Sequence, residues 1–462
     1  MSQEVYSPLK RSVQYVIEST ARNSIDDGAN EDLSKDSSAH TGTTHFPLGD
    51  VTDFTTNTAF APIDIDSARL QSRAESYRGI FEGSLDMDFI VTNWRFLHFF
   101  LGTTDAGNDG ARTHTMTESM DLVHGGFYAI SQRPKMDVFA GCVGESMSLT
   151  LSRGDVARAS MTVQALKHGR FEKANILTSA PTSSYGSTGV NDSLVAQHFR
   201  FSDGANNFDA TIEVLDNVTL PTAGSGDDAI TVTSTDSGVT ATIALGSNYE
   251  TWDNYGLWVG ASITVTGFTT DTANDIDHMN DTYTVTGISG RSLTVGSKTT
   301  TTDPFPTSVT IDATNNKEAT PVISFNAYNF SEYVNSCDIG INHTYARGGQ
   351  WDSPFASYFT RSDFSDTTLS MTIDLFEKSN GSLFRAIVEN EFKSKVIVTL
   401  TRGSNDSAVF TFPKLKLYDL PQSFDEAIRA TLEFDVLNDE SLGYPLSVLV
   451  TDDIEDYDKS EA

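Results

Sequence analysis

The residue types that most often act as catalysts or metal ligands are present, but their spacing matches no known site. The nine histidines show neither the HExxH spacing of zinc proteases nor an HxxxH pair accompanied by CxxC. No glycine-rich loop ends in Lys-Ser or Lys-Thr, and Gly144-Glu-Ser146-Met-Ser148 does not match a nucleophile elbow. We therefore predict that the protein is not an enzyme and has no catalytic residues, no metal site and no cofactor.

Acidic residues gather at two places that resemble sites. The segment Asp105-Ala-Gly-Asn108-Asp109-Gly110 resembles a calcium loop but lacks the downstream bidentate acid, so we favour a hairpin tip. Asp86 and Asp88 stand two residues apart, which puts both on one face of a strand. A solvated face explains this spacing better than an acid/base pair.

The formal net charge of -32 is the most unusual property of the chain. A surface that holds nucleic acid needs Lys and Arg against the phosphates, so this charge argues against a nucleic-acid-binding surface. Two explanations remain, and both can hold. One is a halophilic host, which the frequent Asp and sparse Lys favour. The other is a surface past which DNA must slide without adhering.

Composition places the chain among globular proteins, with 38% hydrophobic and 10% aromatic residues over 462 residues. No apolar run approaches the ~20 residues that a membrane-spanning helix needs, so we expect no membrane insertion. No signal peptide is visible. Cys142 and Cys337 cannot form a disulfide framework, and we expect both to be small, buried apolar residues.

Two segments repeat one order of elements: strand, strand, short helix, strand, and a strand-turn-strand hairpin. Apolar and polar residues alternate in the expected strands. The spacing is roughly 270–285 residues, and Arg158-Ala159 matches Arg429-Ala430 in register. The first segment comprises Ile63–Ile65, Ser84–Ile90, a helix after Asn93, Thr115–Leu122, Met147–Leu151 and Ala159–Ala165. The second comprises Ile339–Ile341, Leu369–Leu375, a helix after Ser382, Lys395–Leu400, Leu415–Leu417 and Ala430–Val436.

Both helices are expected to be short and amphipathic. Asn93 and Ser382 are the expected N-caps, and Gly102 is the expected end of the first helix. The residues expected on the buried faces are Trp94, Leu97 and Leu101 in the first helix, and Leu383, Ala386 and Ile387 in the second.

The segment between the repeats differs in composition. Residues 206–316 are rich in Thr, Asp, Gly and Val and almost lack Lys and Arg. Short β-rich runs separated by Gly, Asn and Asp predict an inserted all-β domain, either a sandwich or a small barrel. The expected strands are Ala229–Thr233, Val239–Ile243, Ser262–Thr266, Thr282–Thr286 and Ser292–Val295.

The predicted fold class is mainly β, with two tandem β-sandwich units, each with a short helix, and the all-β insert. The polar N-terminal segment is expected to order only against a neighbour, and the acidic C-terminal segment to be a solvated tail. The predicted parts are an N-terminal arm (1–60), a first β unit (61–205), the insert (206–316), a second β unit (317–450) and an acidic tail (451–462).

This order of elements resembles the tail tube proteins, or major tail proteins, of long-tailed, non-contractile phages and related archaeal viruses. The resemblance covers residues 60–200 and 320–450 and rests on patterns rather than on one motif. The patterns are the Met147–Leu166 hairpin, Phe412-Pro413 leading into Leu415–Leu437, the helix between edge strands in each half, and Leu442-Gly-Tyr-Pro-Leu446.

The resemblance implies a structural virion protein, made in the host cytoplasm, whose subunits close into stacked rings around a lumen that conducts genomic DNA. Most family members carry one tube unit and form hexamers, whereas duplicated members form trimers with pseudo-sixfold symmetry. A homotrimer with an immunoglobulin-like decoration domain is therefore implied. The implied partners are further copies of the chain, tape measure, tail terminator and distal tail or baseplate proteins, and DNA that passes without specific binding.

Acidic strand positions would then face the lumen. On each alternating strand, apolar residues are expected to face the core and their acidic neighbours the opposite side. If that side is the lumen, its carboxylates repel phosphates and let DNA slide. The alternative is an ordinary solvent-facing row on the outside of the ring. The lumen candidates are Asp86, Asp88, Asp374, Glu433 and Asp435.

Ring-to-ring contacts are expected from segments that become ordered during assembly. We assign them to the N-terminal arm and to the loop from Tyr345 to Ser362, with Arg347 and Trp351 as stacking candidates.

Two other functions remain open. A carbohydrate-binding adhesin or receptor-binding protein could stack sugars on Trp252, Tyr255 and Trp258, although we favour core packing for these rings. An acidic surface-layer or capsid component would also be β-rich.

Overall fold

A computed structural model shows a mainly β protein, which confirms the predicted fold class at that level. All strand pairings among the described residues are antiparallel, and they form three sheets accompanied by two short α-helices. The described residues are 12–18, 46–67, 72–102, 113–118, 123–130, 135–172, 198–201, 208–220, 228–235, 240–268, 279–296, 308–311, 320–349, 356–361, 365–376, 380–402, 406–424 and 428–452.

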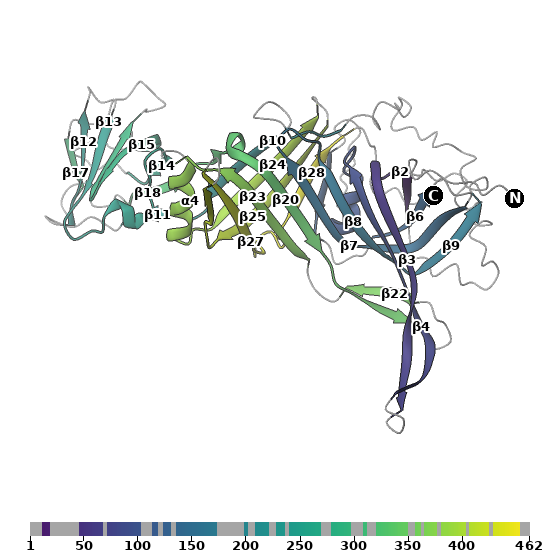
Figure 1. Ribbon diagram of the computed structural model, residues 1–462. Coiled ribbons are helices and arrows are strands. Elements are labelled where there is room, and N and C mark those ends of the chain that lie inside the picture. Colours follow the sequence, from purple (N-terminus) through teal and green to yellow (C-terminus); the bar gives the residue numbers. More distant parts are fainter. Residues whose placement is uncertain are drawn as a thin grey trace.

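One continuous sheet, here called the main sheet, runs through the body of the molecule (Figure 1). Its central joint is the pairing of β7 with β20, which places Leu149 opposite Ile339. Beyond β27 the sheet ends in two short ladders, formed by the last residues of β25 and by β26. In order, the strands are β3 (Asp50–Ser67), β4 (Ser72–Ile90), β8 (Arg158–Ala165), β7 (Lys135–Ser152), β20 (Val334–Asn342), β23 (Asp366–Asp374) and β27 (Ile428–Val436). Both β25 (Asp406–Leu417) and β26 (Gln422–Phe424) then pair with β27, one after the other along its length.

Two further groups of strands pair with the N-terminal parts of β7 and β25. The first group is β2 (Phe46–Pro47), β1 (Ser12–Glu18), β6 (His124–Ile130) and β9 (Lys167–Glu172). The second is β19 (Tyr328–Asn329), β10 (Phe208–Val214), β24 (Ser394–Arg402), β28 (Ser447–Thr451) and β5 (Thr113–Thr117).

The pairings define two strand sets that match partner by partner. We call β1–β9 the first set, and β10, β19, β20 and β23–β28 the second set. β1 pairs with β6 and β2, as β10 pairs with β24 and β19. The order β3-β4-β8-β7 corresponds in the same way to β20-β23-β27-β25.

Matching irregularities fix the register between the sets. β3 shifts register between Val51 and Asp53, and β20 shifts between Val334 and Ser336. Because Val51 lies opposite Phe89 and Val334 lies opposite Ile373, the two bulges occupy equivalent places. A β-bulge interrupts the strand ladder and is conserved among related units, so equivalent bulges indicate that the two sets are related.

The same register corrects one predicted match. Thr56 lies opposite Leu85 in the first set, where Ile339 lies opposite Leu369 in the second. The counterpart of Ile339-Gly340-Ile341 is therefore Thr56-Asn57-Thr58. The predicted counterpart, Ile63–Ile65, lies further along β3, opposite Glu75–Tyr77.

The strand after the first helix also differs from the prediction. β24 corresponds to β6, because both pair with the first strand of their set. Residues 113–117 instead form β5, which crosses to the second set and pairs with β28. This cross-pairing gives the two sets a second joint.

The predicted N-terminal arm is wrong for its described residues. β1 pairs along its whole length with β6, and Val13 and Tyr15 are buried in the core. The boundary at residue 60 falls inside β3. Residues 12–18 and 46–60 are therefore structural strands of the first set.

The insert lies inside the second set, after its first strand β10. Its sheet confirms all five predicted strands and extends to Phe325, beyond the predicted boundary at 316. β10, predicted to belong to the insert, pairs with β24 instead. In order, the insert strands are β11 (Val218–Thr219), β18 (Val322–Phe325), β14 (Ser262–Thr266), β15 (Asp281–Ser289), β16 (Ser292–Gly296), β13 (Thr240–Leu245), β12 (Ile230–Thr235) and β17 (Ser308–Ile311).

The insert lies beside helix α4 (Asn380–Glu389) in Figure 1, and aromatic side chains join the two. The Phe325 ring stacks on Trp258 at 5.2 Å and lies 5.5 Å from Phe392, just after α4. Gly256 has φ +76°, and a Cβ there would lie 2.4 Å from the Phe392 ring. Only glycine allows this close approach.

Both helices bury the predicted faces. In the first, the 3₁₀ turn η2 (Arg95–Leu97) leads into α2 (His98–Leu101), which ends at Gly102 with φ 66°. The predicted cap, Asn93, lies one residue before the N-cap, Trp94, although its side chain accepts the Arg95 N–H at 3.2 Å. In the second, α4 begins at Asn380, so the expected cap, Ser382, lies within the helix. The six residues predicted to face the core are all buried.

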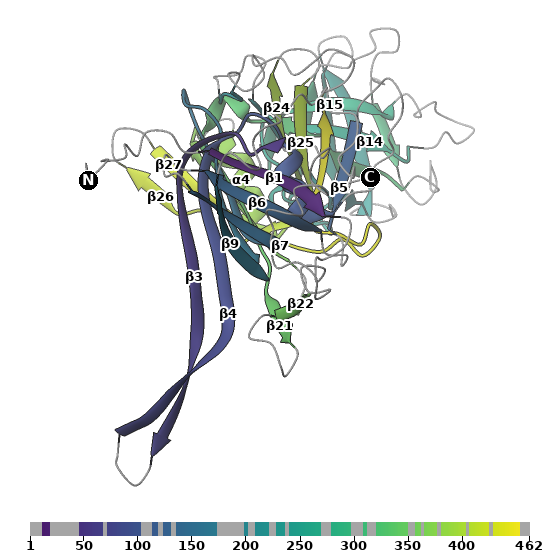
Figure 2. The ribbon, with the colours of Figure 1, turned by 90° about the vertical axis from the view of Figure 1, so that its right-hand side faces the viewer.

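Two hairpins extend from the main sheet. β3 and β4 form the longer one, which projects well beyond the body in Figure 2. β21 (Tyr345–Gly349) and β22 (Ala356–Arg361) form the shorter one, so most of the predicted loop from Tyr345 to Ser362 is a β-hairpin.

The start of the predicted acidic tail is also part of the fold. Thr451 ends β28, and buried Asp452 lies 3.5 Å from His114 Nε2 on β5. Residues 453–462 lie outside the described residues.

Candidate functional site

The main sheet has one apolar face and one acidic face, as strand alternation predicts. Asp86, Asp88, Glu433 and Asp435 are exposed, whereas the alternate apolar residues of β4, β23 and β27 are buried. These buried residues are Leu85, Met87, Phe89, Leu369, Met371, Ile373, Leu432 and Phe434. We call the side that carries the four exposed carboxylates the acidic face.

Cross-strand pairing joins the acidic residues of the two sets into continuous rows. Asp86 and Asp366 end one such row, and successive strands between them are about 4.8 Å apart. The row therefore spans roughly 20 Å and crosses the β7–β20 joint. Its members are Asp86, Thr162, Ser146, Asn342 and Asp366.

The acidic face holds further carboxylates that were not among the predicted candidates. Asp53 lies directly opposite Asp88, and Asp338 lies opposite Ser370, whose other neighbour is Glu433. The apolar-acidic alternation in Cys337-Asp338-Ile339 could have indicated Asp338. The signal at Asp53 on β3 was weaker, because Phe54 packs against the core but the next inward positions are Thr56 and Thr58.

Few positive charges balance these carboxylates. Arg158, Arg429 and Lys416 project on the same side, because they pair with Ile90, Asp374 and Asp435 respectively across the sheet. Lys416 also lies 3.7 Å from the Glu391 carboxylate. Arg158 is bound to Asp155 at 3.3 Å, so its charge is locally compensated. The rest of the described face is largely Ser and Thr, as the sequences of β7, β8 and β23 show.

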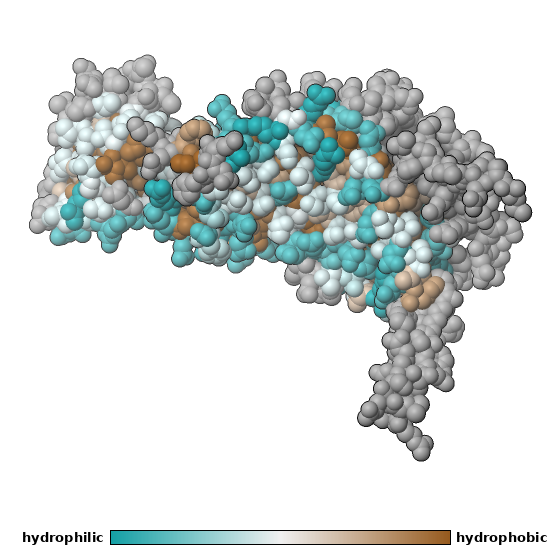
Figure 3. Space-filling model, viewed as in Figure 1, coloured by the Kyte–Doolittle hydropathy of each residue, from teal (hydrophilic) through white to brown (hydrophobic). Residues whose placement is uncertain are grey.

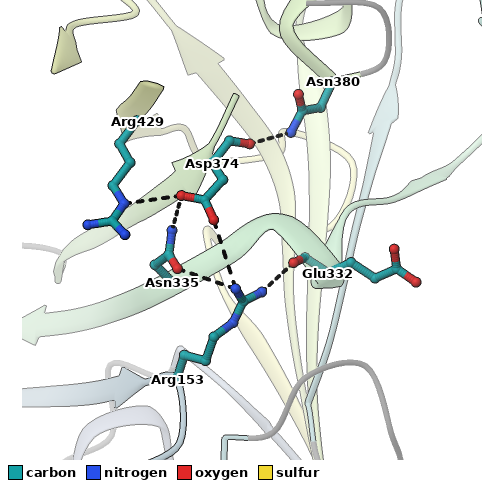
Figure 4. A network of polar contacts seen from close by, with 6 residues as sticks. All are labelled: Arg153, Glu332, Asn335, Asp374, Asn380 and Arg429. Atoms are coloured by element: carbon teal, nitrogen blue, oxygen red, sulfur yellow. Dashed lines mark hydrogen bonds and ion pairs between the residues drawn. The ribbon is translucent and has the colours of Figure 1, made fainter. Parts of the chain in front are cut away.

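Asp374 differs from the other lumen candidates because arginines neutralise it (Figure 4). Its Oδ1 accepts hydrogen bonds from Arg429 Nε at 3.1 Å and from Asn335 Nδ2 at 2.7 Å. Arg153, from the turn after β7, reaches its Oδ2 at 3.9 Å and also bonds Glu332 O. Asp374 thus joins the two sets and contributes little free negative charge, contrary to its predicted role.

Arg347, a predicted ring-stacking residue, makes several contacts within the chain. Its guanidinium donates to Phe81 O at 2.6 Å and to Gln164 Oε1 at 3.2 Å, and it lies 5.6 Å from the Phe359 ring centre. These contacts hold the β21–β22 hairpin against β4 and β8. Arg347 is therefore a positioning residue within the chain, and Trp351 lies outside the described residues.

A buried polar cluster holds the same hairpin at its other end. Arg361 forms an ion pair with Glu118, and both side chains are almost fully buried. Glu118 also accepts the Ser365 N–H at 2.7 Å. Nearby, His343 Nδ1 lies 3.2 Å from Gly144 O and 2.9 Å from the Tyr345 hydroxyl. Burial and the Arg361 charge lower the pKa of His343 to about 4.

The described residues contain no group of side chains arranged to hold a metal ion. The calcium-like segment at Asp105–Gly110 lies outside them. Cys142 and Cys337 are buried, as predicted, and neither forms a disulfide; burial raises the pKa of the Cys337 thiol. In the described part of the chain, none of the helices is long and apolar enough to cross a membrane.

The three insert aromatics pack into the protein, as favoured above. Trp252 is fully buried, and its Nε1 donates to Ile243 O and Arg291 O. Tyr255 and Trp258 are partly buried against the same core. In Figure 3 the described surface is mostly hydrophilic or intermediate, and hydrophobic colour gathers only in small areas.

No family model matches the sequence, and no curated protein matches it.

Proposed function

We propose that this chain is a structural subunit of a viral tail tube. In this proposal copies of the chain close into rings, the rings stack, and genomic DNA passes through a negatively charged lumen. The two strand sets act as tandem tube units, and the insert is an immunoglobulin-like decoration domain on the outside.

The observation that carries the proposal is the acidic face of a single sheet that spans both sets. Asp86 and Asp88 of the first set and Glu433 and Asp435 of the second project from the same side. A DNA channel needs a wall that repels phosphates and offers few Lys or Arg to bind them. This face meets both conditions.

The matched strand sets support the proposed ring symmetry. A chain that carries two equivalent units can close a pseudo-sixfold ring with three copies. Closure would also remove the open sheet edges, which otherwise invite uncontrolled pairing. No observation favours the adhesin function, because the aromatic rings that it needs are packed into the protein.

Electron microscopy of the purified protein tests the proposal. Tubes of stacked rings are the expected result. Separate particles with sugar affinity would support the adhesin, and flat lattices or shells would support a surface-layer or capsid component; either would overturn the tube.

A further inference from the structure

We propose that copies of this chain join head to tail by β-strand addition, with β3 of one copy pairing to β26 of the next. The register is that of the β7–β20 joint within the chain. The inference deepens the proposed function by naming the contact between subunits, and it rests on that function only for closure into a ring.

The joint within the chain supplies the template. β7 and β20 place Leu149 opposite Ile339 and Thr150 opposite Asp338. The Arg153 N–H donates to Asn335 O at 2.9 Å, which makes these two residues a hydrogen-bonded pair. Backbone groups alternate in direction along an antiparallel ladder, so Ile339 also bonds across the joint, whereas Asp338 and Thr150 form a non-hydrogen-bonded pair.

The equivalent positions lie on the two outer edges of the main sheet. Ile339 corresponds to Thr56 on β3, and Asp338 corresponds to Thr55. On the other edge, Gln422 on β26 corresponds to Leu149, because Gln422 lies opposite Ala430 as Leu149 lies opposite Ala159. Thr150 corresponds to Ser423 in the same way. Among the described residues, β3 pairs only with β4, and β26 only with β27.

The backbone of β26 is oriented for this addition. Pro421 O accepts the Thr431 N–H at 3.3 Å, so Pro421 directs its backbone groups toward β27. Alternation then directs those of Gln422 outward, as Leu149 directs its own toward β20. The missing N–H of Pro421 does not interrupt the outer edge.

An apolar surface beside β26 independently indicates an interface. Val91 N–H donates to Ala157 O, and Leu375 N–H donates to Ile428 O, so Ala157 and Ile428 are equivalent. Ala157 is fully buried, whereas Ile428 is 48% exposed. Next to Leu375, Phe376 is 54% exposed, although its equivalent Thr92 is 4% exposed.

The equivalent positions of the first set are covered, in part by residues of the second set. Arg402 on β24 donates to Thr92 O at 3.0 Å and lies 4.6 Å above the Phe199 ring. Phe199 N–H in turn donates to Val91 O, and Phe199 O accepts the Ala157 N–H. At the end of the second set, Ile428 and Phe376 stay about half exposed, although the Phe376 ring lies 5.4 Å from that of Tyr333. A following copy would cover them, because the copy that adds β3 also brings the rest of its first set.

Cysteine pairs test this contact in the full-length chain. Thr55→Cys with Ser423→Cys places two exposed residues at the proposed non-hydrogen-bonded pair, where Cβ atoms approach most closely. Mild oxidation is expected to convert most of the protein into covalent oligomers on a non-reducing gel. Mixing the two single variants should give dimers only, since each variant alone has one half of the pair.

Thr56→Cys with Ser423→Cys is the matched control, because adjacent strand residues point to opposite faces. Oligomers from the control pair and not from the test pair would overturn the register. Dimers from one single variant alone would indicate a twofold contact and overturn the head-to-tail arrangement. Tubes that form without cross-links would overturn the β3–β26 contact but not the tail tube function. Cross-linked chains that form no rings would overturn the tail tube function but not the contact.

Discussion

Arg153 Nη1 lies 3.9 Å from Asp374 Oδ2, and this ion pair connects the turn between β7 and β8 in the first strand set to the end of β23 in the second. Both side chains are partly exposed, so the pair alone contributes modestly. Its strength comes from the shared network, in which Asn335 and Arg429 also bond Asp374. The joint between the sets is therefore held by charge-assisted hydrogen bonds as well as by the strand ladder.

We predict that Asp374→Asn lowers the free energy of unfolding by about 2 kcal/mol, because it removes hydrogen bonds to a charged acceptor. Arg153→Gln and the double variant complete a cycle, and a coupling of about 1 kcal/mol is expected between adjacent members of one network. Asp435→Asn, also on the acidic face but exposed, should leave stability unchanged. Equal losses from Asp374→Asn and Asp435→Asn in urea titrations would contradict this role.

Glu118 and Arg361 form a buried pair for which a larger effect is expected. Glu118→Gln should cost about 3–5 kcal/mol, since it leaves a buried guanidinium without its counter-charge. The double variant Glu118→Leu with Arg361→Met should recover most of this loss. Glu391→Gln is the control, because the Glu391 carboxylate near Lys416 is 75% exposed. Thermal unfolding distinguishes these variants, and a Glu118→Gln protein as stable as the control would contradict the prediction.

Stability should fall in acid partly through His343. Its pKa is about 4 in the folded protein and about 6.5 in the unfolded chain, so the folded state binds fewer protons between these values. The corresponding stability is present above pH 6.5 and is lost as pH falls toward 4, by about 3 kcal/mol in all. His343→Gln should flatten the pH dependence of the urea midpoint in this window. Tyr345→Phe should retain it, because burial rather than the tyrosine hydroxyl is the main cause.

Reversing the charge of the acidic face should make the protein retain DNA. We expect a variant with Asp86, Asp88, Glu433 and Asp435 all changed to Lys to bind double-stranded DNA at low salt, and to release it as salt is added. The natural protein should not bind. A variant with Glu213, Glu250, Asp281 and Glu389 changed to Lys gains the same positive charge away from this face. Equal DNA binding by both variants in fluorescence anisotropy would show that total charge, not the face, matters.

The sequence predicted what depends on local alternation. Leu85-Asp86-Met87-Asp88-Phe89 carries its buried and exposed sides in the residue types themselves, and the Thr-rich strands of the insert are bounded by clear turn residues. The acidic face could therefore be predicted at Asp86, Asp88, Glu433 and Asp435. Asp338 carried the same alternation and was missed.

Features that depend on non-local pairing could not be predicted. Thr56 and Ile339 are equivalent in register, yet one is a polar residue on an outer edge and the other is buried between two strands. Because their surroundings differ, Thr56–Thr58 and Ile339–Ile341 have different residue types, and Ile63–Ile65 resembled Ile339–Ile341 more closely in sequence. The cross-pairing of β5 with β28 and the inward contacts of Arg347 likewise depend on partners more than 180 residues away.

The most direct test of the tube is a cryo-electron microscopy reconstruction of the assembled protein. The account predicts stacked rings in which Asp86, Asp88, Glu433 and Asp435 line the central channel and the insert projects outward. A reconstruction with these four carboxylates on the outer surface, or an assembly without a channel, would contradict it.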